Sequence, residues 1–160
     1  LLAGDPYTDS HYLTARAFHN YLREHNVPWQ VEDLTGAHAQ VKQLEHELNQ
    51  RLKSSEAPEL ICSVFAVGSE LIADALVSAN KAGEVMVIGN ELFPESALAL
   101  RRGIFTNIVY KDPVSLAYRG AKTLGDYLLW GKTPAEPVQK GAVEMVFASN
   151  VDRYCELAGI

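Results

Sequence analysis

Ser69, Glu91 and Lys111 are the side chains with which this sequence could bind a polar molecule, because each comes just after an apolar segment typical of a buried strand. Those segments are Leu60–Val67, Val85–Ile88 and Thr106–Tyr110. A hydroxyl group both donates and accepts hydrogen bonds, a carboxylate accepts several, and an ammonium group donates three. Together these groups suit the recognition of a small molecule that carries hydroxyl groups or charge.

Catalytic chemistry is not indicated by the same segments. Val67 and Leu71 stand where a nucleophile elbow around Ser69 would need glycine. No acid and base pair follows any expected strand, and the helical neighbours of His46 are Lys, Gln and Asn rather than metal ligands. We therefore expect no enzyme activity, no catalytic residue, no metal and no cofactor. A small α/β hydrolase or nucleotide-using enzyme is the third hypothesis, and saturable, serine-dependent turnover would support it.

Short apolar segments alternate with longer stretches of helical periodicity along the chain. The expected strands are residues 1–3, 27–31, 60–67, 85–88, 106–110 and 142–147. The expected helices are residues 9–25, 37–53, 68–81, 94–103 and 113–130, the last capped by Asp112 and ended by Gly131. This alternation predicts an α/β fold in three layers, a parallel sheet with helices on both faces. Ligands bind such sheets at the carboxyl ends of the strands, where the polar side chains lie.

Composition and charge narrow the class of protein. A content of 48 % hydrophobic and 21 % charged residues is ordinary for a folded domain and argues against disorder. The net charge of −6 and the lack of a basic run argue against DNA contact by these residues, because phosphate binding needs a basic surface. No segment approaches the roughly 20 apolar residues that span a membrane. Cys62 and Cys155 lie far apart, which favours free thiols and a reducing compartment.

Taken in order, these segments resemble the lac-repressor (LacI/GalR) family of bacterial transcription regulators and the related periplasmic sugar-binding proteins. The stretches that carry the resemblance are Leu1–Asp5 with Thr14–Phe18, Phe65–Leu76, Val85–Glu91, Thr106–Pro113 with Ala117 and Leu124, and Leu128–Pro134. The resemblance covers nearly the whole chain and keeps the order and spacing of the motifs. It implies one lobe of a two-lobed periplasmic-binding-protein type I fold.

The resemblance also implies how the chain is divided. Residues 1–104 would form most of the second lobe, with its start truncated. Residues 105–135 would cross into the first lobe as a strand and a helix, and residues 136–160 would supply a return strand and the C-terminal tail. Most of the first lobe is expected to be absent. The apolar side chains of the crossover helix would then need a partner, which predicts a homodimer or an exchanged segment.

The resemblance assigns the ligand-binding positions. The residues it assigns are Thr14, Arg16, Gly68, Ser69, Asn90, Glu91 and Lys111. The family's Arg, Asn-Asp pair and Gln correspond here to Thr14, Gly68-Ser69 and Lys111, whereas its acid is kept in kind as Glu91. A lysine in the cleft and free N–H groups at a helix start near Ser69 favour a carboxylate or phosphate. Anionic compounds are therefore expected to bind more tightly than neutral sugars, and a Lys111→Gln variant is expected to lose that preference.

Two functions follow from the resemblance. The first is a cytoplasmic effector-sensing domain, in which a sugar-like or anionic effector closes the lobes and alters DNA binding through a region absent from this chain. The alternative is a periplasmic solute-binding protein of an ABC transporter or sensor system. The short link Lys81–Glu84 and the tail Asn150–Tyr154 favour the alternative, whereas the free cysteines favour the regulator.

Overall fold

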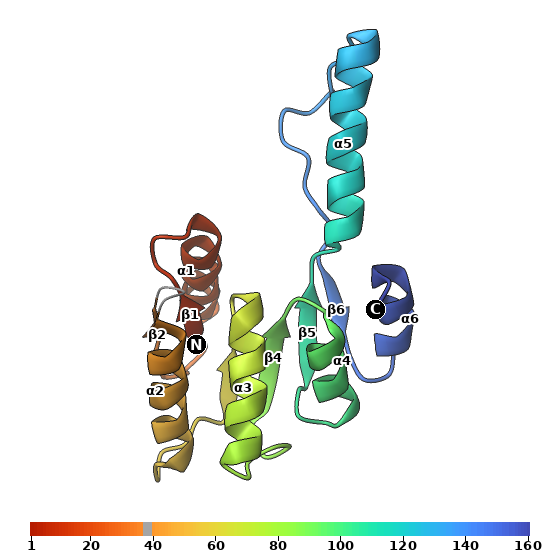
Figure 1. Ribbon diagram of the computed structural model, residues 1–160. Helices are drawn as coiled ribbons and strands as arrows, with labels where there is room; N and C mark the ends of the chain where they lie inside the picture. The colour runs from red at the N-terminus through yellow and green to blue at the C-terminus, as the bar shows by residue number, and fades with distance from the viewer. Residues whose placement is uncertain (37–39) are drawn as a thin grey trace.

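The computed structural model describes residues 1–36 and 40–160, and it shows an α/β fold (Figure 1). The strands are β1 (Leu2–Gly4), β2 (Leu34–Thr35), β3 (Leu60–Cys62), β4 (Met86–Asn90), β5 (Asn107–Tyr110) and β6 (Glu144–Val146). β1 pairs with β2, and the other four form a sheet in the order β3-β4-β5-β6. A parallel bridge between Leu2 and Ser63 places β1 beside β3. The pairing is parallel except between β5 and β6, so the predicted parallel sheet is confirmed apart from its last strand.

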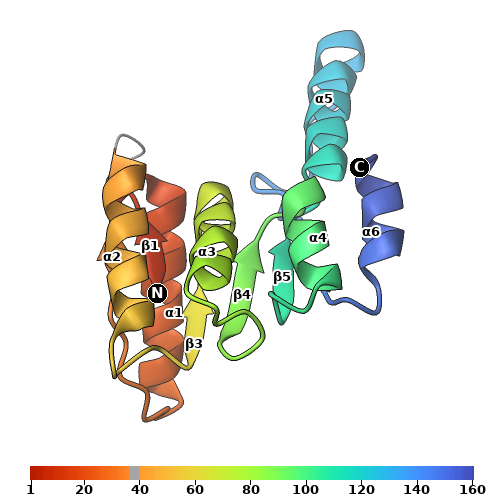
Figure 2. The ribbon, with the colours of Figure 1, turned by 60° about the horizontal axis from the view of Figure 1, so that its bottom comes forward.

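Helices lie on both sides of the strands, as the three-layer prediction requires. They are α1 (Asp9–Glu24), α2 (Val41–Lys53), α3 (Ala66–Ser78), α4 (Pro94–Arg101), α5 (Pro113–Trp130) and α6 (Val151–Ala158). α2 contacts α3, α3 contacts α4, and α4 contacts α6, so these four form one row. α1 packs against β1 from the opposite side (Figure 2).

The core lies between that row of helices and the sheet. α2 contributes Leu44, Leu48 and Leu52, which repeat every four residues and are all buried. Ile72 and Leu76 of α3 belong to the same buried cluster and have no exposed surface. Because apolar side chains at this spacing share one face of a helix, the expected stripe of α2 is confirmed. Residues 37–39, where we expected this helix to begin, lie outside the described residues.

The prediction of a strand over residues 27–31 is wrong, and the short strand β2 lies at Leu34–Thr35 instead. The backbone N–H of Val27 donates to the carbonyl of Leu22 and so helps to end α1. Pro28 has no N–H to donate to a neighbouring strand. The chain therefore joins the start of β1 later, where the Leu1 amino group donates to the carbonyl of Glu32 at 2.7 Å and the Leu34 N–H donates to the carbonyl of Leu1 at 2.9 Å.

The predicted strand over residues 60–67 is too long. β3 ends at Cys62, after which the Ser63 hydroxyl donates to the Phe65 carbonyl at 2.8 Å and turns the chain. α3 then begins at Ala66, so Gly68 and Ser69 lie inside its first turns rather than before them. Conversely, β4 does not stop at Gly89 but continues to Asn90.

The end of the chain differs from the prediction in two ways. β6 runs antiparallel to β5, and residues 151–158 form the helix α6 where only a tail was expected. Val151 and Cys155 are buried one helical turn apart, and Gly159 ends the helix with a φ of 73°. That spacing followed by glycine is a helix signal that the sequence already contains.

α5 projects away from the rest of the molecule, and none of its residues is buried (Figure 1). Its ends follow the prediction. The Asp112 carboxylate accepts a hydrogen bond from the Ser115 N–H at 3.0 Å, and Gly131 ends the helix with a φ of 64°. Apolar side chains cover the far end of the helix, where Leu128, Leu129 and Trp130 are all exposed.

Removing the Asp112 carboxylate is expected to unwind the first turn of α5. The hydrogen bond from Ser115 is the main cause that lowers the pKa of Asp112 below its ordinary value of 3.8. Because the pKa of Asp112 is lowered in the folded protein, the stabilisation by this cap is fully present above pH 3.8, the ordinary pKa. It is lost as the pH falls through the lower pKa of the folded protein. Hydrogen exchange of the Ser115 amide should accelerate in Asp112→Ala at neutral pH. Asp112→Asn is the control variant, because asparagine keeps a hydrogen-bond acceptor at this position and tolerates the φ of 45°. Equal exchange in Asp112→Ala and wild type would contradict the cap.

Candidate ligand-binding site

Asn90, Glu91 and Lys111 meet at the carboxyl ends of β4 and β5, and we call these three residues the strand-end cluster. β4 and β5 are parallel neighbours, with Asn90 opposite Val109. The Lys111 ammonium forms an ion pair with the Glu91 carboxylate, at 2.8 Å from Nζ to Oε1. The same ammonium donates to Oδ1 of Asn90 at 2.9 Å. The sequence placed all three residues after strands, and the structure brings them together.

Glu91 is held in a backbone conformation that few residues adopt. Its φ is +66°, in the left-handed region that costs an ordinary residue about 1–2 kcal/mol. Its N–H donates to the carbonyl of Val109, and its own carbonyl accepts from the Ser96 hydroxyl at 3.1 Å. These bonds tie the residue after β4 to β5 and to α4. Residues in such conformations concentrate at ligand sites, where the surrounding structure maintains them.

The Glu91 carboxylate and the Lys111 ammonium both remain accessible. Their side chains are 26 % and 41 % exposed, so a ligand can reach both groups. Because the two opposite charges lie in contact, the pair as a whole is close to neutral. The arrangement offers a strong acceptor and a strong donor side by side at the sheet edge, which suits hydroxyl groups that both donate and accept.

Asn90 and Ser69 lie beneath this pair. Asn90 is 3 % exposed and Ser69 has no exposed surface. The Ser69 hydroxyl accepts from the Asn90 N–H at 2.7 Å and donates to the Asn90 carbonyl at 3.0 Å. The expectation that Gly68-Ser69 opens a helix is corrected, because α3 already begins at Ala66 and the Ser69 hydroxyl bonds to the end of β4. Asn90 also donates to the Ser63 carbonyl through Nδ2, at 3.4 Å.

Gly68 is buried against the turn that follows β3. A Cβ at this position would lie 2.3 Å from Oγ of Ser63 and 2.9 Å from side-chain atoms of Leu2 and Phe65. No real Cβ contact is so short, so the close approach of α3 to β1 and to the turn requires glycine here. Gly68 thus allows Ser69 to come within reach of Asn90.

Thr14 and Arg16 lie on α1 and do not join the strand-end cluster. Both are exposed. The Thr14 hydroxyl donates to the carbonyl of Ser10 at 2.7 Å, and the Arg16 guanidinium lies over the ring of Tyr12, at 5.4 Å from its centre. These contacts are local to the helix, as they would be for surface residues of α1.

His11 is a candidate that the sequence reasoning missed. Its Nδ1 accepts from the N–H of Asp5, just after β1, at 3.1 Å. Its ring also packs against Phe65, with 5.1 Å between the ring centres. The sequence offers one signal for this contact, because Asp5 directly follows an expected strand, but the partner of Asp5 becomes clear only when α1 folds back over β1.

Tyr110, at the end of β5, borders the cluster from the side of α6. Its ring meets that of Tyr154 edge to face, with 5.8 Å between the centres. Burial raises the pKa of its hydroxyl, and the carboxylates of Asp112 and Glu91 raise it further. Tyr110 therefore stays protonated at neutral pH and packs as a neutral side chain.

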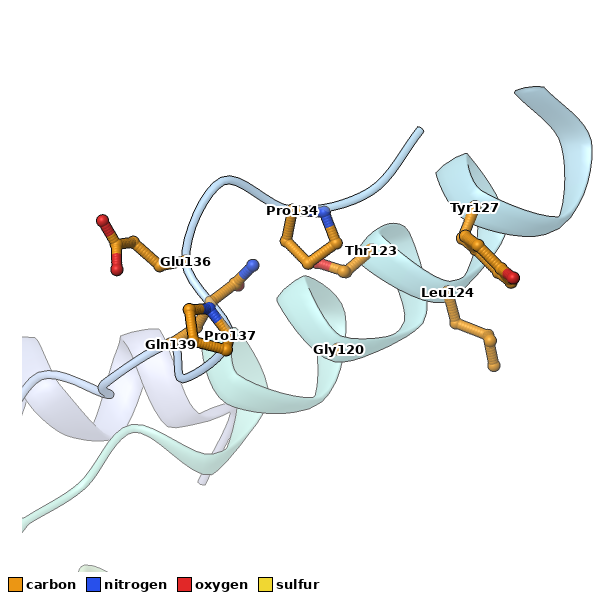
Figure 3. A pocket seen from close by; sticks show the side chains of 8 residues that line it. All are labelled: Gly120, Thr123, Leu124, Tyr127, Pro134, Glu136, Pro137 and Gln139. Atoms are coloured by element: carbon orange, nitrogen blue, oxygen red, sulfur yellow. The ribbon is translucent and has the colours of Figure 1, made fainter. Parts of the chain in front are cut away.

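The hollow along α5 is separate from the strand-end cluster. It lies between α5 and the segment that returns from it, and Gly120, Leu124, Tyr127, Pro134 and Pro137 line it together with three other residues (Figure 3). Its lining is mostly apolar and contains no residue of the cluster. A ligand in this hollow would therefore not contact Asn90, Glu91 or Lys111.

Residues 1–36 and 40–160 contain neither a cluster of metal-ligating side chains nor a membrane-spanning helix. No group of three or more His, Cys, Asp or Glu side chains in these ranges could hold a metal ion. No helix in the same ranges is both long and apolar enough to cross a membrane.

Solved structures share this fold at low sequence identity. A periplasmic ribose ABC transporter protein from Conexibacter woesei superposes with a TM-score of 0.81 at 18 % identity, over 97 % of this chain and 52 % of its own. A Caulobacter myo-inositol binding protein gives 0.81 at 16 % identity, over 99 % and 54 %. A LacI transcriptional regulator from Bacteroides fragilis, itself described as putative, gives 0.76 at 18 %, over 88 % and 47 %. The chain thus spans about half the length of these proteins.

The sequence comparisons identify the family. No curated protein sequence matches the chain. The model of the periplasmic binding protein domain family matches residues 1–133, which is most of the chain. Together with the shared α/β fold, this match shows that the chain belongs to the family of periplasmic binding protein domains.

Proposed function

We propose that this chain is one lobe of a receptor for a neutral, sugar-like molecule. The observation that carries the proposal is the Lys111–Glu91 ion pair at the carboxyl ends of β4 and β5. The sequence favoured an anionic ligand because of Lys111. In the structure the charge of Lys111 is already balanced by Glu91, so a second anion would have to compete with that carboxylate. A polyhydroxy ligand can bond to both groups without separating them fully.

The names of structural neighbours support the ligand class. The neighbours include proteins named for ribose, for myo-inositol and for bound D-allose. These molecules all carry several adjacent hydroxyl groups, which fit a carboxylate beside an ammonium group. The family and these neighbours consist of binding proteins, in keeping with the expectation that no residue here does chemistry.

The other lobe would complete the site. We propose that residues 1–104 and 136–160 belong mainly to this lobe and that the crossover segment 105–135 reaches the other lobe through α5, which projects away with its apolar side chains exposed, whereas β5 stays in this sheet. Ligand bound at the strand-end cluster would then favour the closed arrangement of the two lobes. Thr14 and Arg16 would contribute only at the rim of such a cleft.

A panel of sugars tests the proposed ligand. Titration calorimetry on the protein as its source cell makes it should show binding of at least one of D-ribose, D-allose and myo-inositol. D-ribose 5-phosphate should bind more weakly than D-ribose, and Lys111→Gln should weaken the neutral sugar rather than remove a preference for the phosphate. Tighter binding of the phosphate would overturn the neutral-ligand proposal. No binding by any member of the panel would count against a sugar receptor.

A second candidate is that this lobe senses an effector for a transcription regulator. The observation in its favour is that Cys62 and Cys155 are both free, as suits a reducing compartment. Burial raises the pKa of the Cys62 thiol, so this thiol is protonated and unreactive at neutral pH. A homodimer and DNA binding through another region belong to this candidate. Intact mass and N-terminal sequencing of the cellular protein would reveal either a basic helix-turn-helix or the product of signal-peptide cleavage.

A further inference from the structure

We infer that Ser69 is a positioning residue of the strand-end cluster: from inside α3 it fixes Asn90, and Asn90 in turn fixes Lys111 against Glu91. The inference deepens the proposed function and rests on it, because it concerns the same site. The first step is the contact between α3 and β4. One hydroxyl makes two hydrogen bonds to the same residue, accepting from its N–H at 2.7 Å and donating to its carbonyl at 3.0 Å.

This contact does more than fill the core. Asn90 is the last residue of β4, and Glu91 after it still bonds to β5, but the N–H and the carbonyl of Asn90 itself both bond to the Ser69 hydroxyl. Ser69 supplies both a donor and an acceptor there and has no exposed surface, so water cannot take its place. A buried polar group without a partner is costly, which keeps the two bonds formed.

The second step runs from Asn90 to the charged pair. The side-chain amide of Asn90 donates to the Ser63 carbonyl through Nδ2, at 3.4 Å, which orients its Oδ1. That Oδ1 accepts from Nζ of Lys111 at 2.9 Å, while Glu91 accepts from the same Nζ at 2.8 Å. Lys111 is a flexible side chain, and the buried Asn90 acceptor together with the Glu91 carboxylate holds its ammonium group at one place.

This arrangement explains why Ser69 matters for a ligand that it does not touch. A partly exposed Lys–Glu pair alone is weak, since ordering two long side chains offsets much of the attraction. The buried Asn90 supplies an additional acceptor, and its hydrogen bond to Lys111 offsets the entropy lost when the side chains are ordered. When the Ser69 hydroxyl is removed, the N–H and the carbonyl of Asn90 lose their partner, the Asn90 side chain is oriented less firmly, and Lys111 becomes mobile at the site where the ligand must bind.

The experiment compares Ser69→Ala with Ile72→Val in the same helix. Ile72 is as fully buried as Ser69 but makes no polar contact, so its truncation tests a purely structural loss. NMR detection of the Lys111 ammonium, with coupling across the hydrogen bonds to Glu91 and Asn90, reports the positioning without any ligand. Calorimetry with the tightest-binding sugar of the panel reports its consequence. Ser69→Cys retains a weak donor and should fall between wild type and Ser69→Ala.

We expect Ser69→Ala to lose the Lys111 couplings and to weaken the sugar about tenfold, whereas Ile72→Val retains both. Retained couplings in a folded Ser69→Ala protein would overturn the inference, as would equal effects of the two variants. If Ser69→Ala does not fold, retained couplings in Ser69→Cys at full wild-type strength would overturn it equally. If the wild type binds no sugar and the couplings still depend on Ser69, the positioning role is supported and the proposed function fails.

Discussion

Replacing Glu91 by alanine is expected to weaken sugar binding by about 100-fold or more, because a hydrogen bond to a charged group contributes about 1.5–3 kcal/mol and a carboxylate can accept two. The substitution also leaves the Lys111 ammonium without its ionic partner at the site. The backbone strain at Glu91 is nearly the same in this variant, since alanine is no better suited than glutamate to a φ of +66°. The lost hydrogen bonds to the ligand affect only the bound state, whereas the lost ion pair affects the free protein as well.

Titration calorimetry with the tightest-binding sugar of the panel measures this effect. Glu95→Ala is the matched control, because Glu95 is an exposed acid in the first turn of α4 and lies outside the strand-end cluster. It removes the same charge from the same part of the chain and should leave the affinity nearly unchanged. Similar affinities for Glu91→Ala and wild type would show that the ligand does not contact this carboxylate.

Replacing Leu76 by alanine is expected to lower the free energy of unfolding by about 2–5 kcal/mol, the range for truncating a large buried aliphatic side chain. Leu76 has no exposed surface and belongs to the cluster that joins α3 to the sheet. Domains of this kind are stable by about 5–15 kcal/mol, so the loss is a large fraction of the total. α3 also carries Ser69, so the substitution should loosen the site as well.

Urea unfolding followed by circular dichroism measures this loss as a lower midpoint with an unchanged dependence on denaturant. Val77→Ala is the control, since Val77 is the next residue of α3 and is 58 % exposed. It should change stability little. Equal midpoints for the two variants would mean that α3 does not pack against the sheet through Leu76.

The candidate site shows which features are local and which are not. Glu91 and Lys111 could be placed by sequence alone, because the end of an apolar strand is visible in the chain and parallel strands end at the same edge. The role of Ser69 could not be. Its partner Asn90 lies 21 residues away, and the helix that carries Ser69 begins earlier than its sequence signals.

Two other site predictions depended on resemblance rather than on local physics. Thr14 and Arg16 were assigned as ligand-binding by position, and that assignment stays a prediction. In the structure their contacts are with their own helix. The expected preference for anions depended on Lys111 being free, and the ion pair with Glu91 forms only when β4 and β5 lie side by side.

The sequence by itself determined the α/β class, the buried stripe of α2, and both ends of α5. Each of these is signalled by residues close in the chain: the four-residue spacing of the α2 stripe, the bond from Ser115 to Asp112, and the left-handed turn at Gly131. Tertiary structure decided where β2 joins the sheet, that β6 runs antiparallel, and which polar groups meet at the ends of β4 and β5. The physical reason is that a strand or a buried polar side chain is defined by its hydrogen-bond partner, and that partner lies in a distant segment which only folding brings near.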